Sequence, residues 1–248
     1  MTTRLTPART ITVNADLGES FGLHSFGNDV QLMKSIDVAN VACGFHSGDP
    51  DTMAATVQAA AEHGLKVGAH PGLPDLVGFG RREMRLTPAE VENLILYQVG
   101  ALTASLRRFD VELNHLKPHG SLYGMLSRDA ALMDAAANVA LLYGVSFYGL
   151  AGTQHEKVCR DRGVPFVSEL YVDLNYGPAG ELLIQRRPES TDPAAAAARV
   201  RRVLADGVVE AVDGTLLNLE CDSICVHSDA PNSVAVAAAV RGALTSVS

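Results

Sequence analysis

The stretch "NVACGFHSGDP" at residues 40–50 starts with small apolar residues and ends with an imidazole, a hydroxyl, a glycine and a carboxylate. His46 and Asp49 therefore follow a segment typical of a buried strand, and their side chains can transfer protons or bind metal ions. The same change from apolar to polar residues occurs at five other predicted strands. The groups found there are Asn14, Asp16 and Glu19; His70; His115, Lys117 and His119; Glu169 and Asp173; and His227 and Asp229.

Several of these residues also have a purely structural explanation. Asp49 precedes Pro50, so it can cap a helix that follows. His70 can be a turn residue, and the side chain of Lys117 can extend outward to solvent. Because polar groups recur at so many strand ends, we favour a functional interpretation for the set rather than for any single member.

The elements that would position these groups alternate along the chain. We predict strands at residues 10–16, 38–45, 65–70, 111–117, 145–150, 165–171, 215–219 and 223–227. Helix start signals lie between them. Asp49 and Asp192 each precede a proline, and Thr87 with Glu90 has the spacing of a capping box. A final amphipathic helix is predicted over residues 232–246.

Strands that alternate with helices are typical of parallel sheets joined by crossover helices. Seven or eight such units in 248 residues favour an α/β fold of the (β/α) barrel type, which is TIM-like. The sequence has no G-x-G-x-x-G after the first strand and no Gly-Lys dipeptide, so the common nucleotide-binding loops are absent. We expect residues 1–248 to form one domain.

Composition argues against several classes of protein. The formal net charge of −8 disfavours nucleic-acid binding, which usually requires a basic surface. We expect no membrane association, because no apolar run approaches the roughly 18 residues of a membrane span, and no signal peptide is evident. The four cysteines, Cys43, Cys159, Cys221 and Cys225, lack disulfide-framework or zinc-finger spacing, so we expect a cytoplasmic protein with reduced thiols.

Five longer stretches, taken in order, resemble the family of 5-oxoprolinase A subunits, also called the LamB/YcsF lactam-utilisation family. They are "VNADLGESFG" (13–22), "NVACGFHSGDP" (40–50), "VGAHPGLPDLVGFGRR" (67–82), "HLKPHGSLYG" (115–124) and "ICVHSDAP" (224–231). The resemblance spans essentially the whole chain. It implies a glycoside hydrolase/deacetylase-like barrel, related to polysaccharide deacetylases, and ATP-dependent opening of 5-oxoproline, a lactam, to L-glutamate together with separate B and C subunits. Homo-oligomerisation stays open.

The resemblance and the strand-end positions together assign roles to individual residues. We expect catalytic roles for Asp16, His46, Lys117 and His119. We expect substrate contacts from Asn14, Glu19, Asp49, His70, Tyr123, Glu169, Asp173, His227 and Asp229.

An unstrained lactam is a poor electrophile, so we expect ATP, used through the partner subunits, to phosphorylate the lactam oxygen first. Asp16 or His46 would then be the general base for water, and Lys117 would stabilise the developing negative charge. A divalent metal held by Asp16, His46 and His70 is a further hypothesis, because three nitrogen or oxygen ligands with an open position suit hydrolysis.

Two positions depart from the family pattern. Leu174 replaces an arginine that is usual after the sixth strand, and Ser228 replaces a usual glycine. The first departure affects the expected substrate more than the fold. Two alternative functions therefore stay open: a metal-dependent deacetylase or amidohydrolase that acts alone, and a lactam-binding subunit without catalytic activity.

Overall fold

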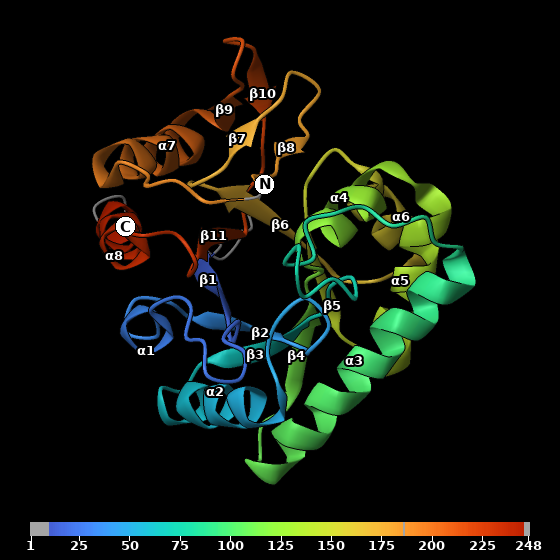
Figure 1. The fold of residues 1–248 in the computed structure, drawn as a ribbon. Coiled ribbons are helices and arrows are strands. Elements are labelled where there is room, and N and C mark those ends of the chain that lie inside the picture. The colour runs from blue at the N-terminus through green and yellow to red at the C-terminus, as the bar shows by residue number, and fades with distance from the viewer. Residues whose placement is uncertain (1–9, 186, 246–248) are drawn as a thin grey trace, which may run out of the picture.

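Seven parallel strands close into a barrel in the computed structural model, which describes residues 10–185 and 187–245. The strands are β1 (Thr12–Leu17), β2 (Val38–Ala42), β3 (Lys66–His70), β4 (Leu113–Leu116), β5 (Ser146–Gly149), β6 (Phe166–Tyr171) and β11 (Ser223–His227). Their order around the barrel is β1-β11-β6-β5-β4-β3-β2, and neighbouring strands are parallel. The predicted (β/α) barrel is confirmed (Figure 1).

Helices cover the outside of this barrel (Figure 1). They are α1 (Asp29–Leu32), α2 (Pro50–Glu62), α3 (Pro88–Arg108), α4 (Gly120–Arg128), α5 (Ala130–Tyr143), α6 (Gln154–Arg162), α7 (Pro193–Asp206) and α8 (Ser233–Thr245). The predicted start signals are present. Asp49 caps α2, Asp192 caps α7, and Thr87 with Glu90 forms the capping box of α3. Within the described ranges, no helix is both long and apolar enough to cross a membrane.

Two antiparallel hairpins lie outside the barrel: β7 (Asn175–Tyr176) with β8 (Leu182–Leu183), and β9 (Val208–Glu210) with β10 (Leu216–Asn218). The segment 215–219, predicted as a barrel strand, therefore belongs to a hairpin. Val212, Asp213 and Gly214 form its turn: the Gly214 N–H donates to the carbonyl oxygen of Ala211, and Gly214, at φ 89°, ends a three-residue loop of a common hairpin type. Because β11 pairs with both β6 and β1, the barrel closes without an eighth strand from this segment.

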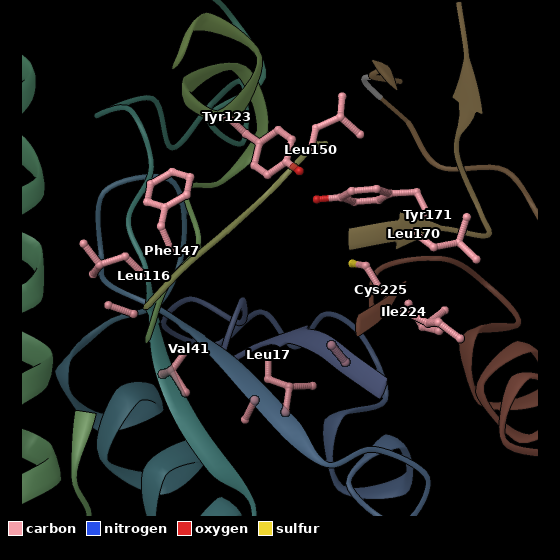
Figure 2. Packing of buried hydrophobic residues seen from close by; sticks show 14 of the residues in the cluster. Leu17, Val41, Leu116, Tyr123, Phe147, Leu150, Leu170, Tyr171, Ile224 and Cys225 are labelled. Atoms are coloured by element: carbon pink, nitrogen blue, oxygen red, sulfur yellow. The ribbon is translucent and has the colours of Figure 1, made fainter. Parts of the chain in front are cut away.

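The inside of the barrel is polar, whereas the outward faces of its strands are apolar. Along β1, Val13 and Leu17 are fully buried in the hydrophobic cluster shared with the surrounding helices, part of which Figure 2 shows. Successive side chains of a strand point to opposite faces, so Asn14 and Asp16 point inward. There, Asn40 of β2 donates hydrogen bonds of 2.8 Å to Oδ1 of Asn14 and to Oδ1 of Asp16.

A second polar side chain, His115, fits inside the barrel because Gly68 leaves room for it. A Cβ atom on Gly68 would lie 2.1 Å from Cε1 of His115. The imidazole Nε2 instead lies 2.6 Å from Oδ1 of Asn40. Burial lowers the pKa of His115 to about 3, so the ring is neutral. Hydrogen-bonded polar groups therefore fill a space that aliphatic side chains fill in other barrels.

His155 of α6 is a further fully buried histidine, and its effect on the stability of the protein can be measured. Its Nδ1 accepts a hydrogen bond from the Leu150 N–H at 3.2 Å, and its Nε2 lies 3.0 Å from the carbonyl oxygen of Tyr123. Burial lowers the pKa of His155 to about 3. In the unfolded chain a histidine titrates near 6.5, so below that pH the unfolded state binds a proton that the native state does not.

The free energy of unfolding should therefore fall as the pH is lowered. His155 alone should account for a loss of about 2 kcal/mol between pH 7 and pH 5. Urea denaturation of the H155Q variant should show a pH dependence weakened by about this amount, whereas H24Q, at an exposed histidine, should keep the wild-type dependence. Equal pH dependence of H155Q and wild type would contradict the prediction.

Candidate functional site

A narrow cavity opens at the carboxyl ends of the barrel strands. Its volume is about 30 Å³, which is room for a few water molecules. Side chains from β1, β3, β6 and β11 and from the segments after β3 and β4 reach it, and an apolar wall comes from the region of the β7–β8 hairpin. The lining includes Asp16, His70, Arg81, Lys117, His119, Tyr123, Tyr171 and His227, with Leu174, Leu182 and Ile184 in the apolar wall.

Lys117 is the central charge of this site. Its side chain is only 1% exposed, so the alternative that it extends to solvent is wrong. The Nζ atom lies 2.7 Å from Oδ1 of Asp16, 3.4 Å from Oε1 of Glu169 and 3.2 Å from Oδ1 of Asn14. A fourth contact joins Nζ to Sγ of Cys225 at 2.9 Å. Burial by itself lowers the pKa of Lys117, but the facing carboxylates raise it well above its usual value. The ammonium therefore stays charged.

Asp16 balances this charge and links Lys117 to two histidines. Its Oδ2 atom lies 3.3 Å from Nε2 of His70 and 3.6 Å from Nε2 of His227. Burial raises the pKa of Asp16, but His70 and Lys117 outweigh burial and hold the pKa well below the usual value. Asp16 is therefore a buried carboxylate surrounded by hydrogen-bond donors and positive charge.

His227 and Asp173 form a dyad at the edge of the cavity. Nδ1 of His227 lies 2.9 Å from Oδ1 of Asp173, which leaves Nε2 facing the cavity and Asp16. Burial lowers the pKa of His227, but Asp173 raises it further, so that the result is about 9. At neutral pH His227 is therefore an imidazolium that can give a proton to a bound ligand.

Glu169 is the second carboxylate that contacts Lys117. Its Oε2 atom accepts hydrogen bonds from the hydroxyls of Tyr171, at 3.0 Å, and Tyr123, at 3.3 Å. Figure 2 shows these two hydroxyls pointing toward each other from β6 and α4. Burial and the carboxylate of Glu169 raise the pKa of both tyrosines well above the usual value, so both stay neutral donors.

Behind the cavity wall, Glu19, His46, His70 and His119 form a buried cluster that could bind a metal. Oε1 of Glu19 lies 3.1 Å from Nε2 of His46 and 3.2 Å from Nδ1 of His119. The rings of His46 and His119 stack with centroids 3.7 Å apart. Burial raises the pKa of Glu19, but its contacts with these two histidines hold it well below the usual value. The set predicted from the sequence had Asp16 in place of Glu19 and His119.

The model of the LamB/YcsF family matches residues 11–248. This chain belongs to the LamB/YcsF family. Family relatives include the lactam utilization protein lamB of Emericella nidulans, 45% identical over 228 residues, which are 90% of each chain. The A subunit of 5-oxoprolinase from Methylococcus capsulatus is 44% identical over 238 residues, covering 94% of this chain and 92% of the relative.

Solved structures agree with the family and the fold. The crystal structure of the lactam utilization protein from Thermus thermophilus superposes with a TM-score of 0.87 at 41% identity, covering 96% of each chain. A putative cellobiose-phosphate cleavage protein from Enterococcus faecalis has a TM-score of 0.55 at 12% identity, with 95% of this chain and 94% of that chain covered. The second likeness concerns the fold alone.

Not every site residue predicted for this LamB/YcsF chain reaches the cavity. Asp49 caps α2 and accepts a further hydrogen bond from the Gly22 N–H, so its carboxylate serves local structure. Its predicted substrate contact has no support in this geometry. His46 is fully buried behind His119 and does not line the cavity. Asp229 pairs with Arg81 at 2.8 Å.

Four polar residues of the site were not predicted from the sequence: Asn40, Arg81, Tyr171 and Cys225. Asn40 and Arg81 lie inside family-like stretches, yet nothing local distinguishes an asparagine in the middle of a strand or an arginine in a loop as a site residue. Cys225 was interpreted as an ordinary core thiol, and only the contact with Lys117 reveals its place. Of the two departures from the family pattern, Leu174 lines the cavity, while Ser228 is buried, and its hydroxyl has no hydrogen-bond partner within the part of the chain that the structure describes.

The Asp16–Lys117 pair gives a stability prediction. Asp16→Asn leaves a buried ammonium with less compensating charge, and breaking a buried pair costs about 3–5 kcal/mol. Urea denaturation should show this loss, and the double variant D16N/K117M should recover part of it because the unpaired charge is gone. D134N, which breaks an exposed pair with Arg162, should cost about 1 kcal/mol or less. A double variant that is less stable than D16N would contradict this account.

Proposed function

We propose that this chain is the ring-opening subunit of an ATP-dependent 5-oxoprolinase, which acts with the B and C subunits to convert 5-oxoproline to L-glutamate. The observation that carries the proposal is a single cavity in which Asp16, Lys117 and His227 offer a base, a fixed cation and an acid. Relatives named as A subunits of 5-oxoprolinase support the substrate. The four cysteines are free and buried, which fits the cytoplasm, where ATP is available.

The chemistry requires activation of the amide. The ring is unstrained and its two ends are tethered, so hydrolysis is disfavoured unless it is coupled to ATP. Transfer of the γ-phosphoryl group to the lactam oxygen gives ADP and an activated ring carbon. We assign this transfer to the partner subunits, because the sequence has none of the common phosphate-binding loops.

Water then attacks the activated carbon in the cavity. Asp16 accepts the proton from water, and Lys117 stabilises the negative charge that develops on oxygen. The carbon–nitrogen bond breaks as the ring nitrogen takes a proton from His227. The carbon keeps its phosphate as an acyl phosphate, which a second water converts to glutamate and inorganic phosphate. A carboxylate with a low pKa is a weak base, which suffices when the electrophile is activated.

The geometry favours Asp16 over His46 as the base. Asp16 lines the cavity, whereas His46 is stacked behind His119. His119 itself lines the cavity, where we assign it an orienting role. We therefore propose Asp16 as the base, which the sequence left undecided between Asp16 and His46.

Arg81 fits the substrate's carboxylate. Its side chain is 8% exposed and lines the cavity, and its described carboxylate partner is Asp229. A guanidinium has five N–H donors, so donors remain for a ligand. Leu174, Leu182 and Ile184 offer an apolar wall to the ring carbons, and they must move apart because the cavity holds only about 30 Å³.

The first test measures glutamate released from 5-oxoproline and ATP by the partner subunits with and without this chain. Release should require the chain, and K117A should reduce the rate by about 10²–10³-fold or more, since it removes a stabilising charge. The exposed lysine variant K157A serves as the matched control and should keep the wild-type rate. Wild-type turnover by K117A would remove Lys117 from the mechanism.

A second test concerns Arg81. Loss of a charge-assisted hydrogen bond costs about 1.5–3 kcal/mol, so R81M should raise KM for 5-oxoproline by roughly 10–150-fold. Binding of 2-pyrrolidinone, which lacks the carboxylate, should change little, and calorimetry can measure both ligands. R128M, at an exposed arginine, is the control. Equal losses for the two ligands would assign the carboxylate contact elsewhere.

The buried His/Glu cluster favours one rival function, a metal-dependent deacetylase or amidohydrolase that acts alone. Hydrolysis of acetylated sugars or amides by the isolated chain with zinc, cobalt or manganese, and without ATP, would support that rival. A lactam-binding subunit without catalytic activity predicts unchanged turnover of the complex when His46, Lys117 and His119 are replaced together.

A further inference from the structure

We infer that Glu19, His70 and His119 form a three-ligand site for a divalent cation of the zinc class, with an open position facing the cavity. The inference rests on the positions of ring nitrogens, carbonyls and one carboxylate, and not on the proposed lactam chemistry. Metal binding and ring opening can therefore be tested separately.

The hydrogen bond of His70 fixes which of its nitrogens is free. Nδ1 lies 2.7 Å from the backbone carbonyl oxygen of Lys117. A carbonyl can only accept, so Nδ1 carries the hydrogen. In the neutral ring Nε2 then has a lone pair, and this atom points toward Asp16 and His119.

His119 is fixed in the opposite tautomer by a different carbonyl. Its Nε2 lies 2.8 Å from the carbonyl oxygen of Phe79, so Nε2 carries the hydrogen and Nδ1 has the lone pair. The loop that supplies this carbonyl is shaped by Gly80, at φ 63°, where a Cβ would lie 2.7 Å from Cβ of His46 and 2.9 Å from Cδ2 of His119. The backbone thus comes close to the two stacked rings.

Three electron-rich atoms consequently converge on one point. Nε2 of His70 and Nδ1 of His119 lie 3.0 Å apart with no hydrogen between them. Oε1 of Glu19 lies 3.2 Å from the second of these nitrogens and 3.9 Å from the first. Such an arrangement of neutral rings and a carboxylate is repulsive unless a proton or a metal cation lies between the atoms. Ligands at about 2.0–2.1 Å from a zinc ion lie about 3.3 Å from one another in tetrahedral geometry, close to these separations.

The surroundings of the three ligands are those of a metal site. Metal-bound histidines nearly always donate their other N–H to a carbonyl or carboxylate, as His70 and His119 do here. His46 differs, because its Nδ1 is buried and has no hydrogen-bond partner among the described residues. If Nε2 of His46 bound the metal, a buried N–H would be left without an acceptor. We therefore assign His46 to orient Glu19 by donating from Nε2 to Oε1 at 3.1 Å.

The open side of the site faces the cavity. His70 and His119 line the cavity, and Asp16, which borders His70, lines it too. Two imidazoles and one carboxylate with an open position are the ligand set of several zinc hydrolases. A cation bound here would lower the pKa of a water molecule in the open position.

The test uses the full chain after treatment with a chelator. Calorimetry with Zn²⁺ should give one site per chain with a dissociation constant in the micromolar range or below, and Co²⁺ should give a visible d–d spectrum. E19Q, H70A and H119A should each weaken Zn²⁺ binding by at least 100-fold. H63A, at an exposed histidine, should bind as wild type does, and H46F should lose no more than about 100-fold because His46 acts through Glu19.

Circular dichroism checks that each variant is folded, and the Co²⁺ spectrum of the wild-type chain tests the ligand set without any variant. A spectrum of nitrogen and oxygen ligands supports the site. An intense thiolate–Co²⁺ band would overturn it, because it would assign the metal to Cys225 with Asp16 and His227, the other group of ligand atoms within reach of one another in the described residues. Absence of Zn²⁺ and Co²⁺ binding at 100 µM metal would also overturn it.

Discussion

A lysine ammonium that is removed from water must be surrounded by opposite charge and hydrogen-bond acceptors. Lys117 meets this requirement through Asp16, Glu169 and Asn14, which belong to β1 and β6. These strands lie on either side of β11, whose Cys225 contacts the same ammonium. The ammonium of Lys117 thus contacts side chains from three strands that are far apart in the sequence. These side chains must be polar or charged, so this part of the barrel interior is polar.

The same constraint organises the chemistry. His70 and Lys117 keep Asp16 ionised, so the carboxylate can attract the imidazolium of His227, and in the proposed mechanism it accepts a proton from water. His227 in turn keeps its proton because Asp173 lies behind it. The proposed acid, base and cation therefore occupy fixed places before any ligand enters, which is the arrangement that lowers the cost of reorganisation during a reaction.

The fold was predictable because its signals are local. Apolar runs, the caps Asp49 and Asp192 and the Thr87–Glu90 capping box each depend on a few neighbouring residues. The exception is residues 215–219, where a three-residue turn ending at Gly214 makes a hairpin from a segment that reads as a barrel strand. The closing of the barrel depends on which strands pair, and no local pattern contains that information.

The candidate site was predictable only as a set of strand-end groups. Their partners depend on strand register and side-chain direction. The sequence alone therefore could not predict the contact of Asn40 with Asp16 or that of Cys225 with Lys117. The same reason explains why the proposed metal ligands were not predicted as a set. Glu19 and His119 meet His70 through loops whose paths the sequence does not specify.

The central claim is that Asp16 and Lys117 act as one unit in ring opening. Its most direct test is the rate of glutamate release by the complete complex containing D16N, K117M or both changes. Residues that act as a unit show strongly non-additive losses. The account predicts that the double variant is no slower than the slower single variant, within about twofold. Losses that multiply, or a single variant with the wild-type rate, would contradict it.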